Sequence, residues 1–99
     1  MSGFRHVALF RWVEGTTTLQ QDEVAARLRE LPGLIPEIRS YSLGVDAKVN
    51  QGAFDFAVVA DFDDRDAYLV YRDHPAHRAV VGEVVGPLLA ERAAIQYEL

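Results

Sequence analysis

The three histidines of the chain, together with Tyr71, are its best candidates for proton-transfer chemistry. An imidazole titrates near neutral pH and can take a proton from a carbon next to a carbonyl group. A tyrosine hydroxyl can hold such a base in place or stabilise the enolate oxygen that forms. We therefore take His77, Tyr71 and His6 as candidate catalytic residues for acid–base work on a carbonyl compound.

Two sequence patterns place His6 and His77 in the same space. Residues 4–13 alternate in polarity as a strand does, and His6 shares one face of that strand with Phe10. His77 precedes Val81 by four residues, so it belongs to the apolar stripe of the last predicted helix. If the helices cover the Phe10 face of the strand, both histidines enter the space between sheet and helices.

A pocket is expected around these side chains. Tyr71, His74 and His77 follow one another at intervals of three residues, so they can converge at one end of the space between sheet and helices. Apolar side chains from the other predicted elements complete the lining. Beside the candidate catalytic residues, the expected substrate pocket contains His74, Leu28, Phe10, Val58 and Val81.

The same residues also have structural interpretations. His74 stands directly before Pro75, where it can cap a helix that starts at the proline. His6 can be a hydrogen-bonded core histidine, and His77 can serve packing through a hydrogen bond to Tyr71. Three bulky side chains can close the cavity altogether, namely Phe10, Trp12 and Leu28.

The elements that position these residues alternate along the chain. Thr18 and Gln21 form a capping-box pattern at the start of the first helix, and Pro32 and Gly33 end that helix. The expected order is strand 4–13, helix 18–31, strand 38–45, strand 54–62, a short helix to 72, a helix from 75 to about 89, and strand 92–99. This order predicts an α+β, ferredoxin-like fold, in which a four-stranded antiparallel sheet carries its helices on one face.

The uncovered face of that sheet predicts self-association. It holds Val7 and Leu9 of the first strand and Ala57 and Val59 of the third. A monomer rarely exposes a contiguous apolar patch of several hundred Å². We therefore expect a homodimer in which two sheets pack face to face across a two-fold axis and form a dimeric α/β barrel.

Composition excludes several classes of protein. The 99 residues predict one domain spanning residues 1–99. The net charge of −5 argues against nucleic-acid binding, and no apolar run is long enough to cross a membrane. No signal-peptide pattern occurs at the start, so we expect a cytoplasmic location.

No cofactor or metal is expected. The chain has no cysteine, which excludes thiolate chemistry and cysteine-based metal sites. The pair His74 and His77, with Asp73 beside it, has loosely metal-like spacing, but Pro75 separates the two histidines and no further ligand completes a site. The glycine-rich motifs of nucleotide-binding sites are absent from the sequence.

Three stretches together resemble the stress-responsive A/B barrel domain family. They are residues 6–10 (HVALF), residues 55–62 (DFAVVADF) and residues 71–77 (YRDHPAH). The resemblance runs over nearly the whole chain, and the last stretch is its most specific part. It implies a ferredoxin-like homodimer, and most members of that family have no assigned reaction.

One plant branch of the family implies roles for individual residues. Its members are polyketide cyclases, which close a poly-β-keto chain by aldol condensation without a cofactor. By this resemblance His77 corresponds to the general base and Tyr71 to its partner, while His6 and His74 correspond to further pocket histidines. Leu28 stands where that branch has a tyrosine, so the pocket is more apolar here and the native polyketide is not the expected substrate.

The sequence thus leaves two classes of function open. The first expectation is a homodimeric stress-responsive barrel of undetermined activity, with a pocket for a small hydrophobic carbonyl ligand between sheet and helices. The alternative is an enzyme, either a cofactor-free cyclase or lyase in which His77 is the base, or a cofactor-independent monooxygenase. An open cavity around His77 favours the enzyme, and a filled one favours a barrel without turnover.

Overall fold

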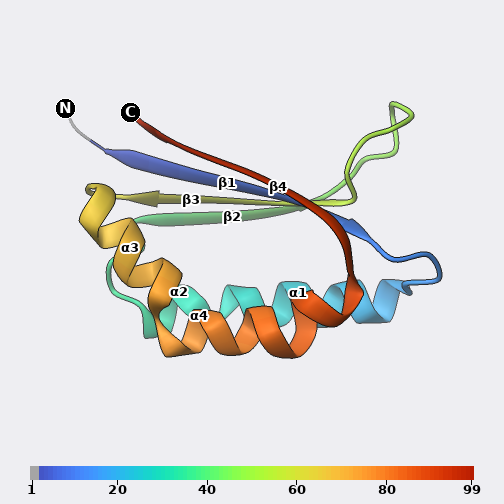
Figure 1. The fold of residues 1–99 in the computed structure, drawn as a ribbon, viewed down its shortest axis with the longest axis horizontal. Coiled ribbons are helices and arrows are strands. Elements are labelled where there is room, and N and C mark those ends of the chain that lie inside the picture. The colour runs from blue at the N-terminus through green and yellow to red at the C-terminus, as the bar shows by residue number, and fades with distance from the viewer. Residues whose placement is uncertain (1–2) are drawn as a thin grey trace.

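The computed structural model describes residues 3–99, which form one four-stranded sheet with helices beneath it (Figure 1). The strands are β1 (Phe4–Trp12), β2 (Ser40–Val45), β3 (Phe56–Phe62) and β4 (Leu89–Glu98). The helices are α1 (Thr18–Arg29), α2 (Leu31–Leu34), α3 (Arg65–Asp73) and α4 (Pro75–Val80), continued by the π-helical turn η1 (Val81–Val85) and the 3₁₀ turn η2 (Gly86–Leu88). The strand order β2-β3-β1-β4, with every pair antiparallel, confirms the predicted ferredoxin-like fold.

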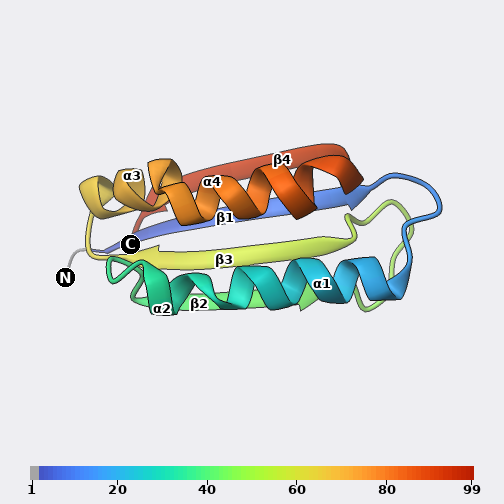
Figure 2. The same ribbon diagram turned by 90° about the horizontal axis from the view of Figure 1, so that it is seen from below.

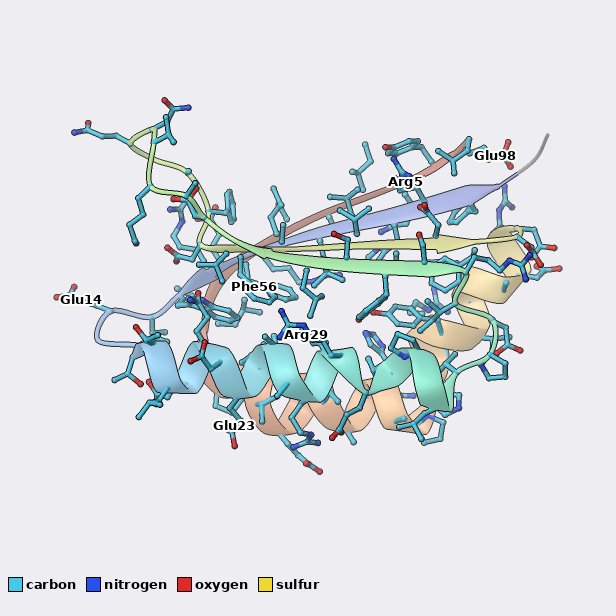
Figure 3. All side chains as sticks on the ribbon, turned by 180° about the vertical axis from the view of Figure 1, so that it is seen from behind. Arg5, Glu14, Glu23, Arg29, Phe56 and Glu98 are labelled. Carbon is cyan, nitrogen blue, oxygen red and sulfur yellow. The ribbon has the colours of Figure 1, made fainter. Side chains whose placement is uncertain are left out.

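The helices cover one face of the sheet, so alternation along each strand decides what is buried. Figure 2 shows α1 beneath β2 and β3, and α4 beneath β1 and β4. Along β1, His6 and Phe10 are buried toward the helices, while Val7 and Leu9 stay partly exposed on the other face. Phe56 points toward the helices in Figure 3, whereas Arg5 lies on the opposite side of the sheet. The expected orientation of β1 is therefore the observed one, and it turns His6 inward.

The N-cap of the first helix lies one residue earlier than its sequence pattern suggested. The capping box is formed by Thr17 and Gln20, because the Thr17 hydroxyl accepts from the Gln20 amide and the Gln20 side chain accepts from the Thr17 amide. The pair Thr18 and Gln21 fits the same pattern, but Gln21 instead accepts a hydrogen bond from the Trp12 indole at 2.7 Å. The expected box was thus wrong by one position.

The last helix ends where expected, but its final turns are not α-helical. It starts at Pro75 with His74 as the N-cap, as predicted. After Val80 the chain widens into η1 and then tightens into η2 at Gly86 and Pro87. β4 follows at once from Leu89 instead of starting at Arg92. The strand therefore gains three residues, of which Leu89 and Glu91 pair with β1, and Arg92 becomes an interior position of the strand.

Candidate functional site

A cavity of about 150 Å³ lies between the sheet and the helices. Seven of the eight side chains proposed for the site from the sequence line it, and they come from β1, β3, α1, α3, α4 and η1. The lining residues are His6, Ala8, Phe10, Leu28, Val58, Tyr71, His77, Val81, Val85, Leu89 and Arg92. The cavity is thus apolar over most of its wall, with two imidazoles, a phenol and a guanidinium as its polar groups.

His77 presents a basic nitrogen, because its other ring nitrogen is engaged. Its Nδ1 lies 3.1 Å from the carbonyl oxygen of Arg72. A carbonyl oxygen only accepts, so Nδ1 carries the proton and Nε2 of the neutral ring keeps its lone pair. Burial is the largest influence on the pKa of His77 and lowers it. The hydrogen bond to the Arg72 carbonyl raises the pKa by less, and the nearby Arg92 adds a still smaller lowering. The ring is therefore neutral at pH 7 and able to accept a proton.

Tyr71 packs against His77 with its ring tilted, and it is not hydrogen-bonded to it. Their ring centroids are 4.2 Å apart. The Tyr71 hydroxyl instead lies 2.9 Å from the Tyr41 hydroxyl of β2. Burial raises the pKa of Tyr71, and it raises that of Tyr41 to about 12, so both phenols stay protonated. Tyr71 thus fixes the plane of the His77 ring through packing, and Tyr41 fixes Tyr71.

His6 is held in the opposite tautomer. The Gln96 amide nitrogen lies 2.9 Å from Nδ1 of His6 and can only donate, so Nδ1 accepts and the proton of the neutral ring is on Nε2. His6 is only 4 % exposed, and burial lowers its pKa to about 4, with smaller contributions from Arg92 and His77. The cavity therefore combines a hydrogen-bond acceptor on His77 with a donor on His6.

Two site residues were missed by the sequence analysis. Tyr41 is not among the candidate residues named from the sequence, yet its hydroxyl is hydrogen-bonded to that of Tyr71, 30 residues away in the sequence. Arg92 lines the cavity from β4, because its register partner Phe10 faces inward. The alternation of residues 92–99 placed Arg92 on the face opposite to Ala93. That pattern was the only feature of the sequence that could have indicated an inward-facing Arg92.

His74 is not among the residues that line the cavity, contrary to expectation. Its Nδ1 accepts a hydrogen bond from the Ala76 amide at 3.0 Å, which caps α4. The ring thus satisfies a backbone group of the first turn and does not contribute to the cavity wall. The structural interpretation of this residue therefore replaces the pocket assignment.

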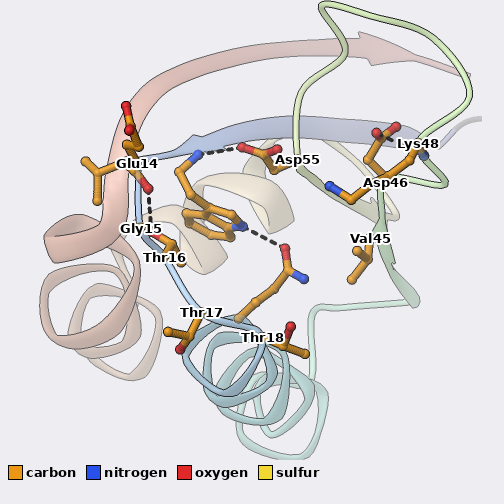
Figure 4. A pocket seen from close by; sticks show the side chains of 12 residues that line it. Glu14, Gly15, Thr16, Thr17, Thr18, Val45, Asp46, Lys48 and Asp55 are labelled. Carbon is orange, nitrogen blue, oxygen red and sulfur yellow. Dashed lines mark hydrogen bonds between the residues drawn. The ribbon is translucent and has the colours of Figure 1, made fainter.

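A larger hollow of about 330 Å³ lies at the other end of the molecule, between the start of α1 and the end of β2 (Figure 4). Trp12 forms part of its wall, where its backbone amide donates to Asp55 at 2.8 Å and its indole donates to Gln21. This placement explains why Trp12 does not fill the smaller cavity. The lining of the hollow includes threonines and carboxylates but no histidine.

Within residues 3–99, no three histidine or carboxylate side chains are grouped so that they could hold a metal ion. In the same range, no helix has the length and apolar character needed to cross a membrane.

Residues 4–99 match the stress-responsive A/B barrel domain, which is nearly the whole chain. The chain belongs to that family. An uncharacterised protein of Streptomyces coelicolor is 33 % identical to this family member over 79 residues, which are 78 % of this chain and 81 % of the relative.

Two solved structures share the fold of this chain, and one of them is also similar to it in sequence. A dimeric ferredoxin-like protein of unknown function from Thermobifida fusca is 45 % identical, with a TM-score of 0.91 over 99 % of this barrel-domain chain and 92 % of that one. A hydroxynitrile lyase from Passiflora edulis has a TM-score of 0.86 over 98 % of this chain and 93 % of its own, at 19 % identity. At that identity the likeness shows a shared fold alone.

Proposed function

We propose that this barrel-domain protein binds a small, largely apolar carbonyl compound in the cavity around His77 and moves a proton at the carbon next to the carbonyl. The observation that carries the proposal is the pairing of opposite tautomers. In His77 the Arg72 carbonyl holds the proton on Nδ1, so Nε2 is unprotonated. In His6 the proton is on Nε2. One ring can accept a proton while the other donates a hydrogen bond.

The proposed step is a reversible enolisation. Nε2 of His77 takes the proton from the α-carbon, and the electron pair of that C–H bond forms the carbon–carbon double bond of the enolate. The negative charge that develops on the carbonyl oxygen is stabilised by the Nε2–H of His6. Return of the proton from His77 restores the carbonyl compound, so the step balances without a cofactor.

The size of the cavity restricts the ligand. About 150 Å³ is well below the roughly 300–1,000 Å³ typical of sites for drug-sized molecules. Phe10 and Leu28 occupy part of the wall instead of leaving room for a long chain. This favours a compact ketone or aldehyde over the extended poly-β-keto chain of a cyclase.

Proton transfer is tested by hydrogen–deuterium exchange at the α-carbon of 4-methyl-2-pentanone in D₂O, followed by NMR. We expect wild type to accelerate exchange, and His77→Gln to remove most of the acceleration, since a positioned base contributes about 10²–10⁴-fold. His74→Asn is the matched control, because His74 caps α4 outside the cavity and asparagine also caps helices. Equal rates for wild type and His77→Gln would contradict the proposal.

A ligand-binding barrel without turnover is the second candidate. It is favoured by the Tyr71 hydroxyl, which is committed to Tyr41 and therefore not directed at a substrate oxygen. In that case the ketone shifts the resonances of the cavity residues, but no His77-dependent exchange is seen. The two candidates share the cavity and differ only in the rate measurement.

Self-association is the other part of the proposal. The outer face of the sheet carries Val7, Leu9, Val59 and Ile95, and Ile95 is 58 % exposed in the single chain. Such a face is covered in an oligomer more often than it is left to water. The Thermobifida fusca protein, 45 % identical, is described as dimeric. We therefore infer a homodimer through this face.

A further inference from the structure

Arg92, an exposed residue of the edge strand β4, brings a positive charge to the wall of the cavity. It lies in β4 on the face turned toward the helices, because its register partner on β1 is the inward-facing Phe10. Its side chain lines the same cavity as His6, Tyr71 and His77. Its charge also lowers the pKa of both histidines, as expected for a cation close to the two rings.

This charge is not neutralised by the part of the chain that the structure describes. Five arginines form ion pairs with carboxylates there, namely Arg5, Arg11, Arg27, Arg39 and Arg72. Within residues 3–99, no carboxylate lies within ion-pair distance of Arg92. The other charged or titratable groups on the cavity wall are two imidazoles and a phenol, and none of them carries a negative charge at pH 7.

The remaining wall is apolar and lies beside the guanidinium. Leu28, Val58 and Val85 contribute hydrocarbon surface from α1, β3 and η1. A ligand that satisfies both regions has an anionic head and a short hydrocarbon tail. A guanidinium pairs with a carboxylate through two parallel hydrogen bonds, which makes a carboxylate the best match for such a head.

We propose that the ligand of this site is a small apolar 2-oxo acid, whose carboxylate binds Arg92 while its hydrocarbon tail lies against Leu28 and Val58. This inference rests on the proposed function and narrows it from carbonyl compounds in general to oxo acids. The carbonyl group, adjacent to the carboxylate, then lies between His6 and His77. Arg92 is a binding and specificity-determining residue in this arrangement and takes no proton.

The experiment compares 4-methyl-2-oxopentanoate with its methyl ester, which keeps the carbonyl and the tail but lacks the charge. Binding to wild type, Arg92→Met and Arg29→Met is measured by titration calorimetry at fixed salt. Arg29→Met removes the same charge from an exposed position of α1 that does not line the cavity. We expect wild type and Arg29→Met to bind the acid about ten-fold or more tightly than the ester, and Arg92→Met to bind the two alike.

Each outcome decides for or against the oxo acid. Equal affinity of wild type for acid and ester, or an equal loss of both in Arg92→Met, overturns the inference and leaves proton transfer on the neutral ketone standing. Binding of neither compound overturns the inference as well, and exchange on 4-methyl-2-pentanone then decides the proposed function separately. Arg92-dependent binding of the acid without His77-dependent exchange supports the inference and contradicts only the catalytic step.

Discussion

At the scale of single residues, the two cavity histidines differ in which ring nitrogen is protonated, and one hydrogen bond to each ring decides this. The Arg72 carbonyl places the proton of His77 on Nδ1, and the Gln96 amide places that of His6 on Nε2. Burial lowers the pKa of both rings, so neither arrangement is lost through protonation near pH 7. Two chemically identical side chains thus carry their protons on different ring nitrogens because their hydrogen-bond partners differ.

The buried His6 makes stability depend on pH. Its pKa is about 4 in the folded chain and about 6.5 when unfolded, so between these values the unfolded state binds a proton that the folded state does not. We expect the free energy of unfolding to fall as pH decreases through this window, by on the order of 2–3 kcal/mol, and His6 to contribute no further loss below about pH 4. Urea unfolding from pH 7 to 3.5 measures this, and His6→Gln should show a smaller decrease. An identical pH dependence of the two proteins would contradict the assignment.

The Tyr41–Tyr71 hydrogen bond makes a second prediction at this scale. Tyr41→Phe leaves the hydroxyl of Tyr71, which is only 2 % exposed, without its partner. We expect a loss of about 1–3 kcal/mol in the free energy of unfolding, and a smaller loss when Tyr71→Phe is added, because removing both hydroxyls leaves no unsatisfied group. Denaturant melts of the single and double variants measure the coupling. Strictly additive losses would show that the two hydroxyls do not interact.

At the scale of elements, the conformation at the end of the last helix determines where β4 joins the sheet. Gly86 lies in a helical conformation directly before Pro87, which most residues avoid because of the proline ring. A Cβ at Gly86 would lie 3.1 Å from the Val81 carbonyl oxygen, a backbone atom that cannot easily move. Glycine therefore permits the wide turn that places Leu89 against Trp12 of β1.

A matched pair of glycines tests this reading. A Cβ at Gly82, in the same turn, meets nothing within 4 Å. We expect Gly82→Ala to stabilise the protein by about 0.4–1 kcal/mol through the unfolded state, and Gly86→Ala to destabilise it by about 1–2 kcal/mol. Thermal unfolding of both variants against wild type is sufficient. Stabilisation by both substitutions would show that Gly86 is not needed for the turn.

Elements are also the scale at which sequence patterns succeed and fail here. Alternation in β1 correctly predicts that His6 faces inward, because a two-residue period admits only two choices once one face is buried. The capping box is misplaced because Thr17–Gln20 and Thr18–Gln21 fit the same sequence pattern. The two are distinguished only in the structure, where the Gln21 side chain accepts a hydrogen bond from the Trp12 indole. Tyr41 is missed for a similar reason, since its partner lies 30 residues away. Contacts between elements leave no periodic trace in the sequence.

At the scale of the whole molecule, the sheet has two different faces. The inner face holds the core and the cavity, while the outer face presents an apolar centre between two ion pairs, Arg5–Asp61 and Arg11–Glu91. An apolar centre with a polar rim is the usual composition of a protein interface. The proposed ligand cavity and the proposed dimer interface therefore lie on opposite faces of the sheet.

Sedimentation velocity tests the outer face. We expect wild type to sediment as a dimer of twice the 11.1 kDa chain mass, and Val59→Lys to shift it to the monomer, because an unpaired ammonium in the centre of the interface is costly. Leu19→Lys is the matched control, since Leu19 is 81 % exposed on α1, away from this face, and its replacement should leave the dimer intact. A wild-type monomer at micromolar concentration, or an unchanged dimer in Val59→Lys, would exclude this interface. Circular dichroism of Val59→Lys distinguishes dissociation from unfolding, because the monomer keeps its helices when only the interface is lost.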